Sequence, residues 1–359
     1  MRGFFAPSVQ IRIDEVIMSN IKVSVVVPVR NEEKYISACL RSLLQQTFPG
    51  ASYEIIVVDG RSSDQTRALV EGFRGEQTKV VCLDNSAGIA PSAMNIGIRQ
   101  AQGEIIIRAD GHNVYPADYI ENCVKYLEQT GADNVGGPWL TVPADDSFGA
   151  RLVAAVLTSP FGVGDSRFRI SSVEGYVETV PFGAFRKELF DRVGMYNEKL
   201  VRNQDNDLNA RIREAGGKIY QTPALRTEYH PVAGFWKLLR VTLRTSQWHL
   251  FSLRENSASM SARHLIPALF VTSVAVLLVA CFSSHLASLG LITVLLTYLL
   301  AGICVAVMQS RAYGPAIVCT LPFACLCFHI SYGIGTLLGI RYLFQAPSSR
   351  PIREGQSIP

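Results

Sequence analysis

Short apolar runs alternate with helical patterns over the first third of the chain. Continuous runs of β-branched and other apolar residues occupy 23–28 (VSVVVP), 54–59 (EIIVVD), 80–83 and 104–109 (EIIIRA). Between them, apolar residues recur at helical spacing in 32–46, 66–73 and 92–102. Runs of this length indicate strands buried on both faces, and their alternation with helices predicts an α/β fold with a mostly parallel central sheet.

The pattern is less regular further along the chain. It predicts a helix at 119–129, a return to the sheet at 134–137, and helices at 186–193 and 205–214. The stretch 159–183 is rich in Gly, Ser and Arg and has poor periodicity, which predicts a mobile functional loop. The segment 235–253 has the pattern of an amphipathic helix at a membrane surface.

Three apolar segments follow, at 265–282, 286–308 and 314–340. The one charged residue between positions 265 and 340 is Arg311, which lies between the second segment and the third. Each segment is near the roughly 20 residues that cross about 30 Å of hydrocarbon. Pro322, His329 and three glycines interrupt the third segment. Whether that segment is a kinked span, a re-entrant hairpin or a helix packed on its neighbours through small residues is open at this point.

The basic residues beside the first apolar segment predict the orientation of the chain. They are Lys237, Arg240, Arg244, Arg254 and Arg263, opposed by Glu255. Because Lys and Arg beside short loops mark the cytoplasmic side, we expect a multi-pass protein of the inner membrane with its N-terminal domain in the cytoplasm. Three full crossings would place Arg341, Arg350 and Arg353 outside, against the same rule, so a re-entrant third segment is the alternative.

The chain therefore divides into parts of different chemistry. The predicted parts are a tail at 1–20, a catalytic domain at 21–234, an interfacial helix and linker at 235–263, a transmembrane region at 264–344 and a tail at 345–359. The first tail has no apolar core long enough for a signal peptide, and Met18 is a second possible start. The eight cysteines lack zinc-ligand spacing. We expect the membrane as a partner and no nucleic acid.

Polar residues follow three of the predicted strands. Asn31 and Glu32 come soon after the first strand, Asp59 ends the second, and Asp110 follows the fourth. Ligands of open parallel sheets bind beyond the carboxyl ends of the strands. The sequence thus predicts a ligand site along one edge of the sheet.

Four sequence blocks carry a family resemblance. They are VSVVVPVRNEE, EIIVVDGRSSDQT, NSAGIAPSAMNIGIRQAQGEIIIRADGH and NQDNDLNARIREAGG. In this order they resemble the signature blocks of inverting family-2 glycosyltransferases, and above all the membrane-bound exopolysaccharide (succinoglycan-type) glucosyltransferases. The resemblance covers 22–343. It implies a nucleotide-diphospho-sugar transferase (GT-A, Rossmann-like) domain that uses a UDP-sugar and a divalent cation.

The resemblance also implies which residues bind the cation. Asp110 and His112 stand where the family usually has Asp-x-Asp, and this chain has Asp-Gly-His. Carboxylate oxygen suits Mg²⁺ or Mn²⁺, and imidazole is a better ligand for Mn²⁺ than for Mg²⁺. The family match therefore makes Asp110 and His112 the expected metal ligands, with the identity of the metal open.

The implied nucleotide site draws on the first two strands. Asp59 matches the family residue that accepts a hydrogen bond from the base, with Gly60 beside it. The other positions implied for the nucleotide are Pro28, Arg30, Glu32, Asn95 and Asp110, with Gly88 in the block that closes over it. A plainer interpretation is that Asp59 and Ser62 cap the following turn or helix.

Asp205 matches the family's general base. Inversion needs one base that removes the proton of the acceptor hydroxyl as the glycosidic bond breaks. Gln204 replaces the Glu that usually precedes this Asp, and Asp207 would point elsewhere on the helix. The alternative is an exposed acid at a helix N-terminus, favoured by the helix dipole.

The acceptor side has a weaker signal. Candidates to hold a lipid diphosphate are Arg167, Arg169, Arg244, Gln247 and Trp248. Arg offers bidentate contacts to phosphate, but basic residues near a membrane also meet anionic head groups in general. His230 could assist at the diphosphate or be structural.

These residues lead to one expected function and its alternatives. We expect an inverting transfer of a hexose from a UDP-sugar to a polyprenyl-diphosphate-linked saccharide in exopolysaccharide or cell-surface glycan assembly, alongside other glycan-assembly proteins. A polyprenyl-phosphate sugar synthase is the enzymatic alternative, and a processive synthase fits less well. A membrane scaffold with a degenerate nucleotide-binding domain is the non-enzymatic one.

Overall fold

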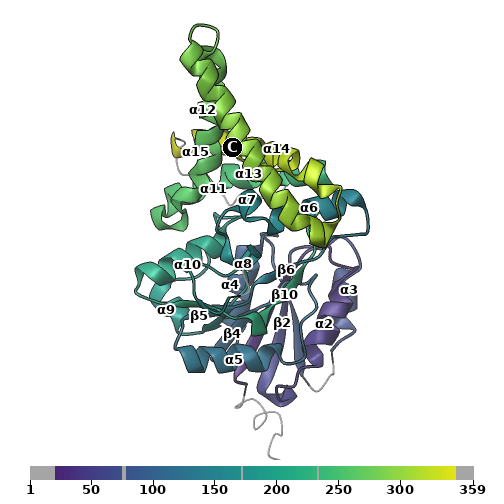
Figure 1. Ribbon diagram of the computed structural model, residues 1–359. Helices are drawn as coiled ribbons and strands as arrows, with labels where there is room; N and C mark the ends of the chain where they lie inside the picture. The colour runs from purple at the N-terminus through teal and green to yellow at the C-terminus, as the bar shows by residue number, and fades with distance from the viewer. Residues whose placement is uncertain (1–20, 75–77, 171–172, 233, 345–359) are drawn as a thin grey trace, which may run out of the picture.

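The computed structural model describes residues 21–74, 78–170, 173–232 and 234–344. The two predicted tails and the choice between Met1 and Met18 lie outside these residues. A sheet domain forms one end of the molecule, and the C-terminal helices are stacked on it (Figure 1).

The described part of the chain has an eight-stranded sheet with the order β3-β2-β1-β4-β8-β5-β9-β7. Its strands are β1 (Val23–Val29), β2 (Tyr53–Asp59), β3 (Lys79–Asp84), β4 (Ile105–Arg108), β5 (Asn134–Gly136), β7 (Gly175–Tyr176), β8 (Ala184–Arg186) and β9 (Ile219–Gln221). β1, β2, β3 and β4 are parallel, whereas β8 is antiparallel to both of its neighbours and β7 to β9. The predicted mostly parallel α/β sheet is confirmed.

Helices cover both faces of the sheet, which is why its central strands are apolar throughout. Alternate residues of one strand enter different cores: Val25 and Val27 belong to one, and Val26 to the other. The first core includes α2 (Ile36–Leu44), α3 (Thr66–Glu71) and α5 (Tyr119–Thr130). The second includes α4 (Ala90–Gln100), α9 (Leu189–Val193) and α10 (Gln204–Glu214).

Two local predictions need correction. The helix predicted at 186–193 begins only at Leu189, because Ala184–Arg186 pairs with β4 and β5 as strand β8. The stretch predicted as a loop at 159–183 contains α7 (Pro160–Val163), α8 (Arg167–Ile170) and β7. Ser159 starts α7, since its hydroxyl accepts from the backbone N–H of Phe161 at 3.1 Å and of Gly162 at 3.3 Å.

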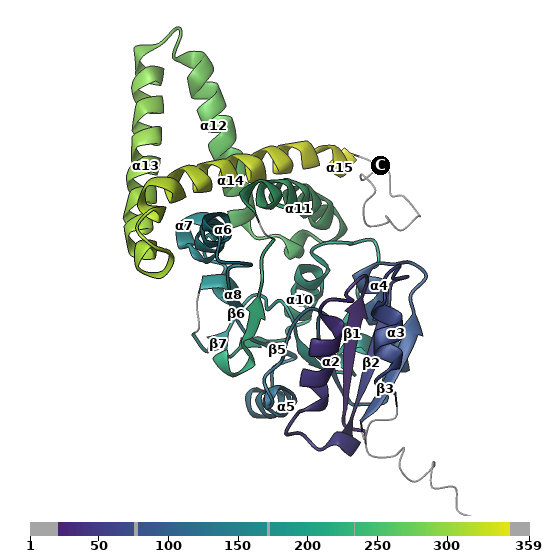
Figure 2. The ribbon, with the colours of Figure 1, turned by 90° about the vertical axis from the view of Figure 1, so that its right-hand side faces the viewer.

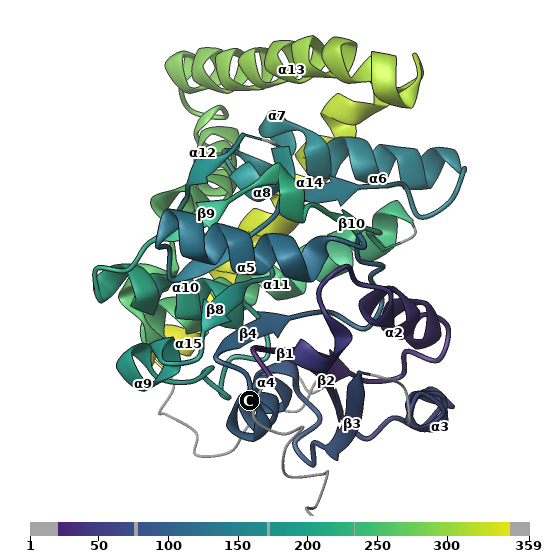
Figure 3. The ribbon, with the colours of Figure 1, turned by 90° about the horizontal axis from the view of Figure 1, so that it is seen from below.

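A further helix, α6 (Phe148–Thr158), was not predicted. It begins at a Ser147 cap, whose hydroxyl accepts from Ala150 N at 3.1 Å. Its apolar residues pack in a third core with residues of α11 (Phe235–Glu255), α13 (His285–Tyr313) and α14 (Ile317–Gly339). In the view from below, α6 and α13 extend in about the same direction (Figure 3). α6 thus joins the sheet domain to the C-terminal helices. β6 (Trp139–Thr141), which precedes α6 in the chain, pairs in parallel with β10 (Thr227–Tyr229) in a small second sheet.

The apolar segments form three helices that are long and apolar enough to cross a membrane. α12 (Ile266–Ala280), preceded by the short helix η4 (Ala262–Leu265), and α13 form a hairpin that projects away from the sheet. α14 runs across the base of that hairpin and continues into α15 (Arg341–Phe344) (Figure 2). The helices differ in burial. In an apolar stretch of 18 residues within each, 44% of the residues are buried in the helix that contains α14, against 6% in the one that contains α12 and 11% in α13.

α14 is one continuous helix with Pro322 inside it, so the third segment is not a helical hairpin. It packs along α11 through small residues. A Cβ at Gly335 would overlap Ser246 and Leu243, and one at Gly339 would lie 2.9 Å from Gln247 O. The Ser331 hydroxyl donates to Leu239 O at 2.7 Å. The glycines that looked like interruptions in the sequence are therefore the places where two backbones approach.

Candidate active site

The ends of β1 and β2 meet at the predicted nucleotide edge. Val29 and Asp59 are paired in register, and Gly60 N donates to Val29 O at 2.8 Å. The Asp59 side chain is buried, and its Oδ1 accepts from Ser62 Oγ at 2.5 Å. In this structure Asp59 therefore caps the turn after β2, as the plainer interpretation has it, while lying at the carboxyl end of the strand.

The loop before α4 closes on the same edge. Arg30 Nη1 donates to Gly88 O at 3.1 Å. Gly88 has a φ of +69°, a conformation that favours glycine. A Cβ at Gly60 would lie 3.3 Å from Val29 O and 3.4 Å from Gly88 Cα. These contacts bring β1, the turn after β2 and the loop before α4 together as one rim. Pro28 belongs to this rim as a residue of β1.

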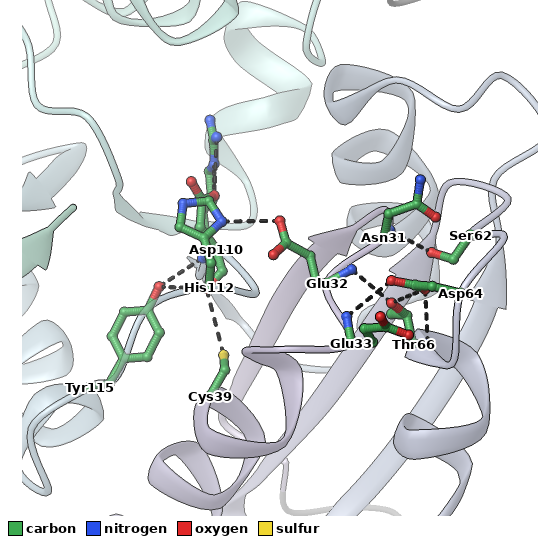
Figure 4. Close-up of polar contacts among 11 residues, drawn as sticks. Asn31, Glu32, Glu33, Cys39, Ser62, Asp64, Thr66, Asp110, His112 and Tyr115 are labelled. Carbon is green, nitrogen blue, oxygen red and sulfur yellow. Dashed lines mark hydrogen bonds and ion pairs between the residues drawn. The ribbon is translucent and has the colours of Figure 1, made fainter. Parts of the chain in front are cut away.

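Hydrogen bonds order the segment after β1 (Figure 4). Asn31, with a φ of +58°, accepts from Ser63 N at 2.8 Å, and Glu32 N donates to Thr66 Oγ1 at 2.7 Å. The Glu32 carboxylate is 3.2 Å from His112 Nδ1. This hydrogen bond raises the pKa of His112 above its ordinary range, and the charge of Asp110 acts in the same direction. His112 is thus held toward β1 by an acid at the end of that strand.

Asp110 follows β4, and its backbone N–H donates to the Tyr115 hydroxyl at 2.7 Å. Among the described residues, no group of three or more His, Cys, Asp or Glu side chains is arranged to hold a metal ion. A Mg²⁺ or Mn²⁺ that binds with a nucleotide takes one or two protein ligands and completes its shell with phosphate oxygens and water. Asp110 and His112, near enough to interact electrostatically, fit that kind of site.

Arg108 joins two of the predicted site residues. It ends β4, is 5% exposed, and donates from Nε and Nη2 to Asp110 Oδ1 at 3.3 and 3.2 Å. Its Nη1 donates to Asp205 Oδ1, at the first turn of α10. Asp110 and Asp205, 95 positions apart in the sequence, therefore share one guanidinium.

The two acids of α10 have different surroundings. Burial raises the pKa of Asp205 from 3.8 to about 6, although Arg108 lowers it and 26% of the side chain is exposed. Asp207 is 2% exposed and accepts from Arg211 at 2.9 Å. Arg211 in turn donates to the carbonyl oxygens of the Val193–Met195 segment. Asp207 thus ties α10 to the segment after α9, whereas Asp205 faces the β4 end.

The side chain of Asn95 does not point to the predicted nucleotide edge. It is 2% exposed, its amide nitrogen donates to Tyr196 O at 2.9 Å and Glu198 Oε1 at 2.8 Å, and its oxygen accepts from Tyr196 N at 2.9 Å. These bonds fasten α4 to the segment that leads into α10.

The structure separates Arg167 from Arg169. Arg167 is exposed and lines a cavity of about 330 Å³, together with Phe168, Arg213 and Arg263. Arg169 stacks on Trp139, with its guanidinium carbon 4.4 Å from the ring centroid, and lies 5.4 Å from the ring of Tyr229. The pair does not form a single clamp.

The candidates on α11 also have different environments. Trp248 is 6% exposed and packs against Phe251, and Gln247 lies against Gly339 of α14. Arg244 is exposed. It precedes Thr245, whose hydroxyl accepts from Arg202 at 3.4 Å in the loop before α10. Arg244 is therefore the one of these three that is both charged and open to a ligand. His230 is exposed and 3.5 Å from Glu228.

Sequence reasoning missed Arg108. The signal available was a charged residue in a run that otherwise predicts a strand buried on both faces (EIIIRA). Buried charges are paired in folded proteins, so Arg108 had to have an acidic partner. The sequence did not show which.

Comparisons with known proteins relate the sheet domain to a described family. Residues 24–194 match the sequence model of the family described as glycosyl transferase family 2. The succinoglycan biosynthesis protein ExoA of Rhizobium meliloti (strain 1021) is 32% identical over 219 residues, which cover 59% of this chain and 66% of that protein. The chain thus spans just under two thirds of the length of this relative.

A second curated relative and one solved structure extend the comparison. A dolichyl N-acetyl-alpha-D-glucosaminyl phosphate 3-beta-D-2,3-diacetamido-2,3-dideoxy-beta-D-glucuronosyltransferase of Methanococcus voltae is 23% identical, over 62% of this chain and 70% of that protein. The mannosyltransferase PcManGT from Pyrobaculum calidifontis, solved with GDP-Man and Mn²⁺, has the same fold at a TM-score of 0.57 and 19% identity, over 89% of this chain and 88% of that one. By the match over residues 24–194 and by its likeness to ExoA, the sheet domain of this chain is a glycosyl transferase family 2 domain.

Proposed function

We propose that this protein transfers a hexose, with inversion, from a UDP-sugar to a hydroxyl of a polyprenyl-diphosphate-linked saccharide, in the assembly of an exopolysaccharide or another cell-surface glycan. The observation that carries the proposal is the meeting of Asp110 and Asp205 on one buried guanidinium at the end of β4. One acid suits the leaving diphosphate and its cation, and the other suits the attacking hydroxyl.

The donor half of the site is assigned to the rim formed by β1, β2 and the loop before α4. Asp59, which here accepts from Ser62, would instead accept a hydrogen bond from an N–H of the nucleotide's uracil. Pro28, Arg30, Glu32 and Gly60 would surround the nucleotide. Asp110 and His112 would hold Mg²⁺ or Mn²⁺, which stabilises the negative charge that develops on the leaving diphosphate. We leave Asn95 out of the donor contacts, because its amide is committed to Tyr196 and Glu198.

Asp205 is assigned as the base. A base must be ionised at the working pH and must be reachable by the acceptor. A pKa of about 6 leaves the carboxylate ionised at neutral pH, and 26% of its side chain is exposed. Asp207 does not suit this role, because it is 2% exposed and its carboxylate is paired with Arg211.

We assign the acceptor to the region between the sheet domain and α11. Arg244 is assigned as an acceptor contact because it is exposed and lies beside the loop that leads into α10. Arg167 is assigned as a second contact because it lines the cavity described above. Both guanidinium groups can bind phosphate oxygens. The ExoA relative is named for succinoglycan biosynthesis and the Methanococcus relative for a dolichyl-linked phosphate, which supports a lipid-linked acceptor in glycan assembly.

For the membrane, we propose that the hairpin of α12 and α13 crosses and that α14 lies along the cytoplasmic surface. The first half of α14 packs against α6. In α15, which follows α14 directly, the backbone oxygen of Tyr342 accepts a hydrogen bond from Arg254 of α11 at 3.0 Å. A helix held against α6 of the sheet domain at one end and against α11 at the other lies across these two helices, and we do not expect it to span about 30 Å of hydrocarbon as well. Two crossings return the basic C-terminal tail to the cytoplasm, in agreement with the distribution of Lys and Arg.

The direct test of the function is product analysis. Membranes that contain the protein are incubated with labelled nucleotide sugars and a lipid extract, and the glycolipid product is identified. A UDP-sugar should label a lipid that already carries a sugar diphosphate. Labelling of the bare lipid phosphate would instead show a polyprenyl-phosphate sugar synthase, and no labelling with any donor would reject catalysis.

The membrane arrangement is tested with reporter fusions. Alkaline phosphatase, active outside the cytoplasm, and green fluorescent protein, fluorescent inside, are fused after Ser283 in the hairpin turn or at the C-terminus of the full chain. We expect phosphatase activity at Ser283 and fluorescence at the C-terminus. Phosphatase activity at the C-terminus would show that α14 crosses.

A further inference from the structure

We propose that Arg108 is a positioning residue that bridges Asp110 and Asp205 and so sets the place and direction of the base. The inference rests on the proposed function, because that function gives the two acids their roles. Arg108 itself would act through these acids rather than on the sugar.

The bridge has a rigid origin. Arg108 is the last residue of β4, in register with Val26 of β1, and its backbone N–H donates to Gly183 O at 2.9 Å. Its side chain is 6% exposed and lies over the ring of Phe182, 5.7 Å from the centroid. A strand in the middle of a sheet is among the least mobile supports in a protein. Asp205, by contrast, sits on the first turn of a helix that is preceded by a loop.

All three guanidinium nitrogens of Arg108 donate to the two acids. Nε and Nη2 donate to Asp110 Oδ1, and Nη1 donates to Asp205 Oδ1. Arg can do this because its donors lie in a planar fork, whereas Lys offers a single point charge. Since the contact uses Oδ1 of a partly exposed carboxylate, Oδ2 of Asp205 is the oxygen that can face the acceptor hydroxyl.

Charge gives a second reason for the bridge. Two carboxylates close together in a poorly solvated site repel each other. A buried cation between the acids reduces this repulsion, and the acids in turn offset the cost of burying the guanidinium.

The arrangement also has a consequence for the divalent cation. Arg108 partly neutralises Asp110, which is assigned as a metal ligand. Removing the positive charge should therefore strengthen cation binding while it weakens catalysis. A residue that merely supports the fold would weaken both.

The test uses the full-length protein in detergent with two substitutions, Arg108→Lys and Arg108→Met. Arg186, exposed on the neighbouring strand β8, provides the matched controls Arg186→Lys and Arg186→Met. Four quantities are measured for each variant: kcat and donor KM for sugar transfer, Mn²⁺ binding to the enzyme with UDP by electron paramagnetic resonance, and the thermal unfolding temperature. If Arg108→Met does not fold, Arg108→Lys decides the question.

For Arg108→Lys we expect kcat to fall by roughly 100-fold, as for a misplaced catalytic group, with donor KM within about threefold of the wild type. For Arg108→Met we expect a similar or larger loss and Mn²⁺ binding that is tighter by a few-fold. Added to Asp205→Asn, Arg108→Lys should cost little more, because the base is already gone.

Two results would overturn the inference. One is a wild-type kcat for Arg108→Lys, which would show that charge alone suffices. The other is a joint fall of unfolding temperature and Mn²⁺ affinity in both variants, which would show a structural residue. If the wild type transfers no sugar at all, the proposed function fails, while the Mn²⁺ measurement still decides whether Arg108 opposes cation binding at Asp110.

Discussion

Gly335 of α14 lies directly on Ser246 of α11, with no space for a side chain between the two helices. A Cβ built on Gly335 would also overlap Leu243 O on the same helix. This contact fixes α14 against the helix that faces the sheet domain. The geometry of the membrane part is therefore coupled to the catalytic part through a glycine.

Gly335→Val should destabilise the protein, because neither overlapping group is the end of a long, flexible side chain. Overpacking of this kind costs roughly 1–3 kcal/mol. Gly290→Val is the matched control, since a Cβ there meets only Leu277 at an ordinary 3.5 Å. Thermal unfolding in detergent should show a lower temperature for the first variant and little change for the second. Equal unfolding temperatures would mean that the helices can separate without loss.

Asp205→Asn should abolish sugar transfer and leave donor binding intact. Loss of a general base costs roughly 100- to 10,000-fold in rate. Glu214→Gln, at the exposed C-terminal end of the same helix, is the control. Turnover is followed with the labelled donor, and binding by calorimetry with UDP. Normal turnover by Asp205→Asn would move the base to another residue.

The rate should depend on pH through Asp205. A base must be deprotonated to act, and burial raises the pKa of Asp205 from 3.8 to about 6. With donor and metal saturating, kcat should be level above this pH and should fall by roughly tenfold per unit below it. Measurements between about pH 5 and about pH 8 locate the midpoint. A flat profile down to the lower end would contradict the raised pKa.

A chelator should suppress transfer, and Mn²⁺ or Mg²⁺ should restore it. His112→Asp recreates the family's usual Asp-x-Asp pattern, and replacing imidazole by carboxylate should shift the preference toward Mg²⁺. The ratio of the rates with the two ions, compared with that of the wild type, is the readout. Full activity in EDTA would remove the metal from the reaction.

Asn95→Ala should lower stability rather than act through the nucleotide. The substitution leaves the backbone groups of Tyr196 without their buried partner, at a cost of roughly 1–3 kcal/mol. Gln100→Ala, exposed at the end of the same helix, is the control. Thermal unfolding and donor KM are both measured. A large rise in donor KM with an unchanged unfolding temperature would return Asn95 to the nucleotide site.

The sequence alone was sufficient for the parallel strands β1 to β4 and for the edge of the sheet at which Asp59 and Asp110 lie. Buried strands need uninterrupted apolar runs and helices need apolar residues at their own spacing, so both patterns are written in local sequence. Asp59 and Asp110 could be assigned to one edge because parallel strands present the same ends there. Long uncharged segments similarly predicted the three long apolar helices of the described part of the chain.

Only the tertiary structure decided which distant groups meet. EIIIRA contains Arg108, but nothing near it in sequence shows that Asp205, on another element, is its partner. The Gly-rich third apolar segment allowed several arrangements, and its packing on α11 selected one. Arg167 and Arg169 look alike in sequence, yet one lines a cavity and the other stacks on Trp139. Pairing, burial and helix crossing depend on contacts between elements, and such contacts are not encoded in the spacing of residues within any one of them.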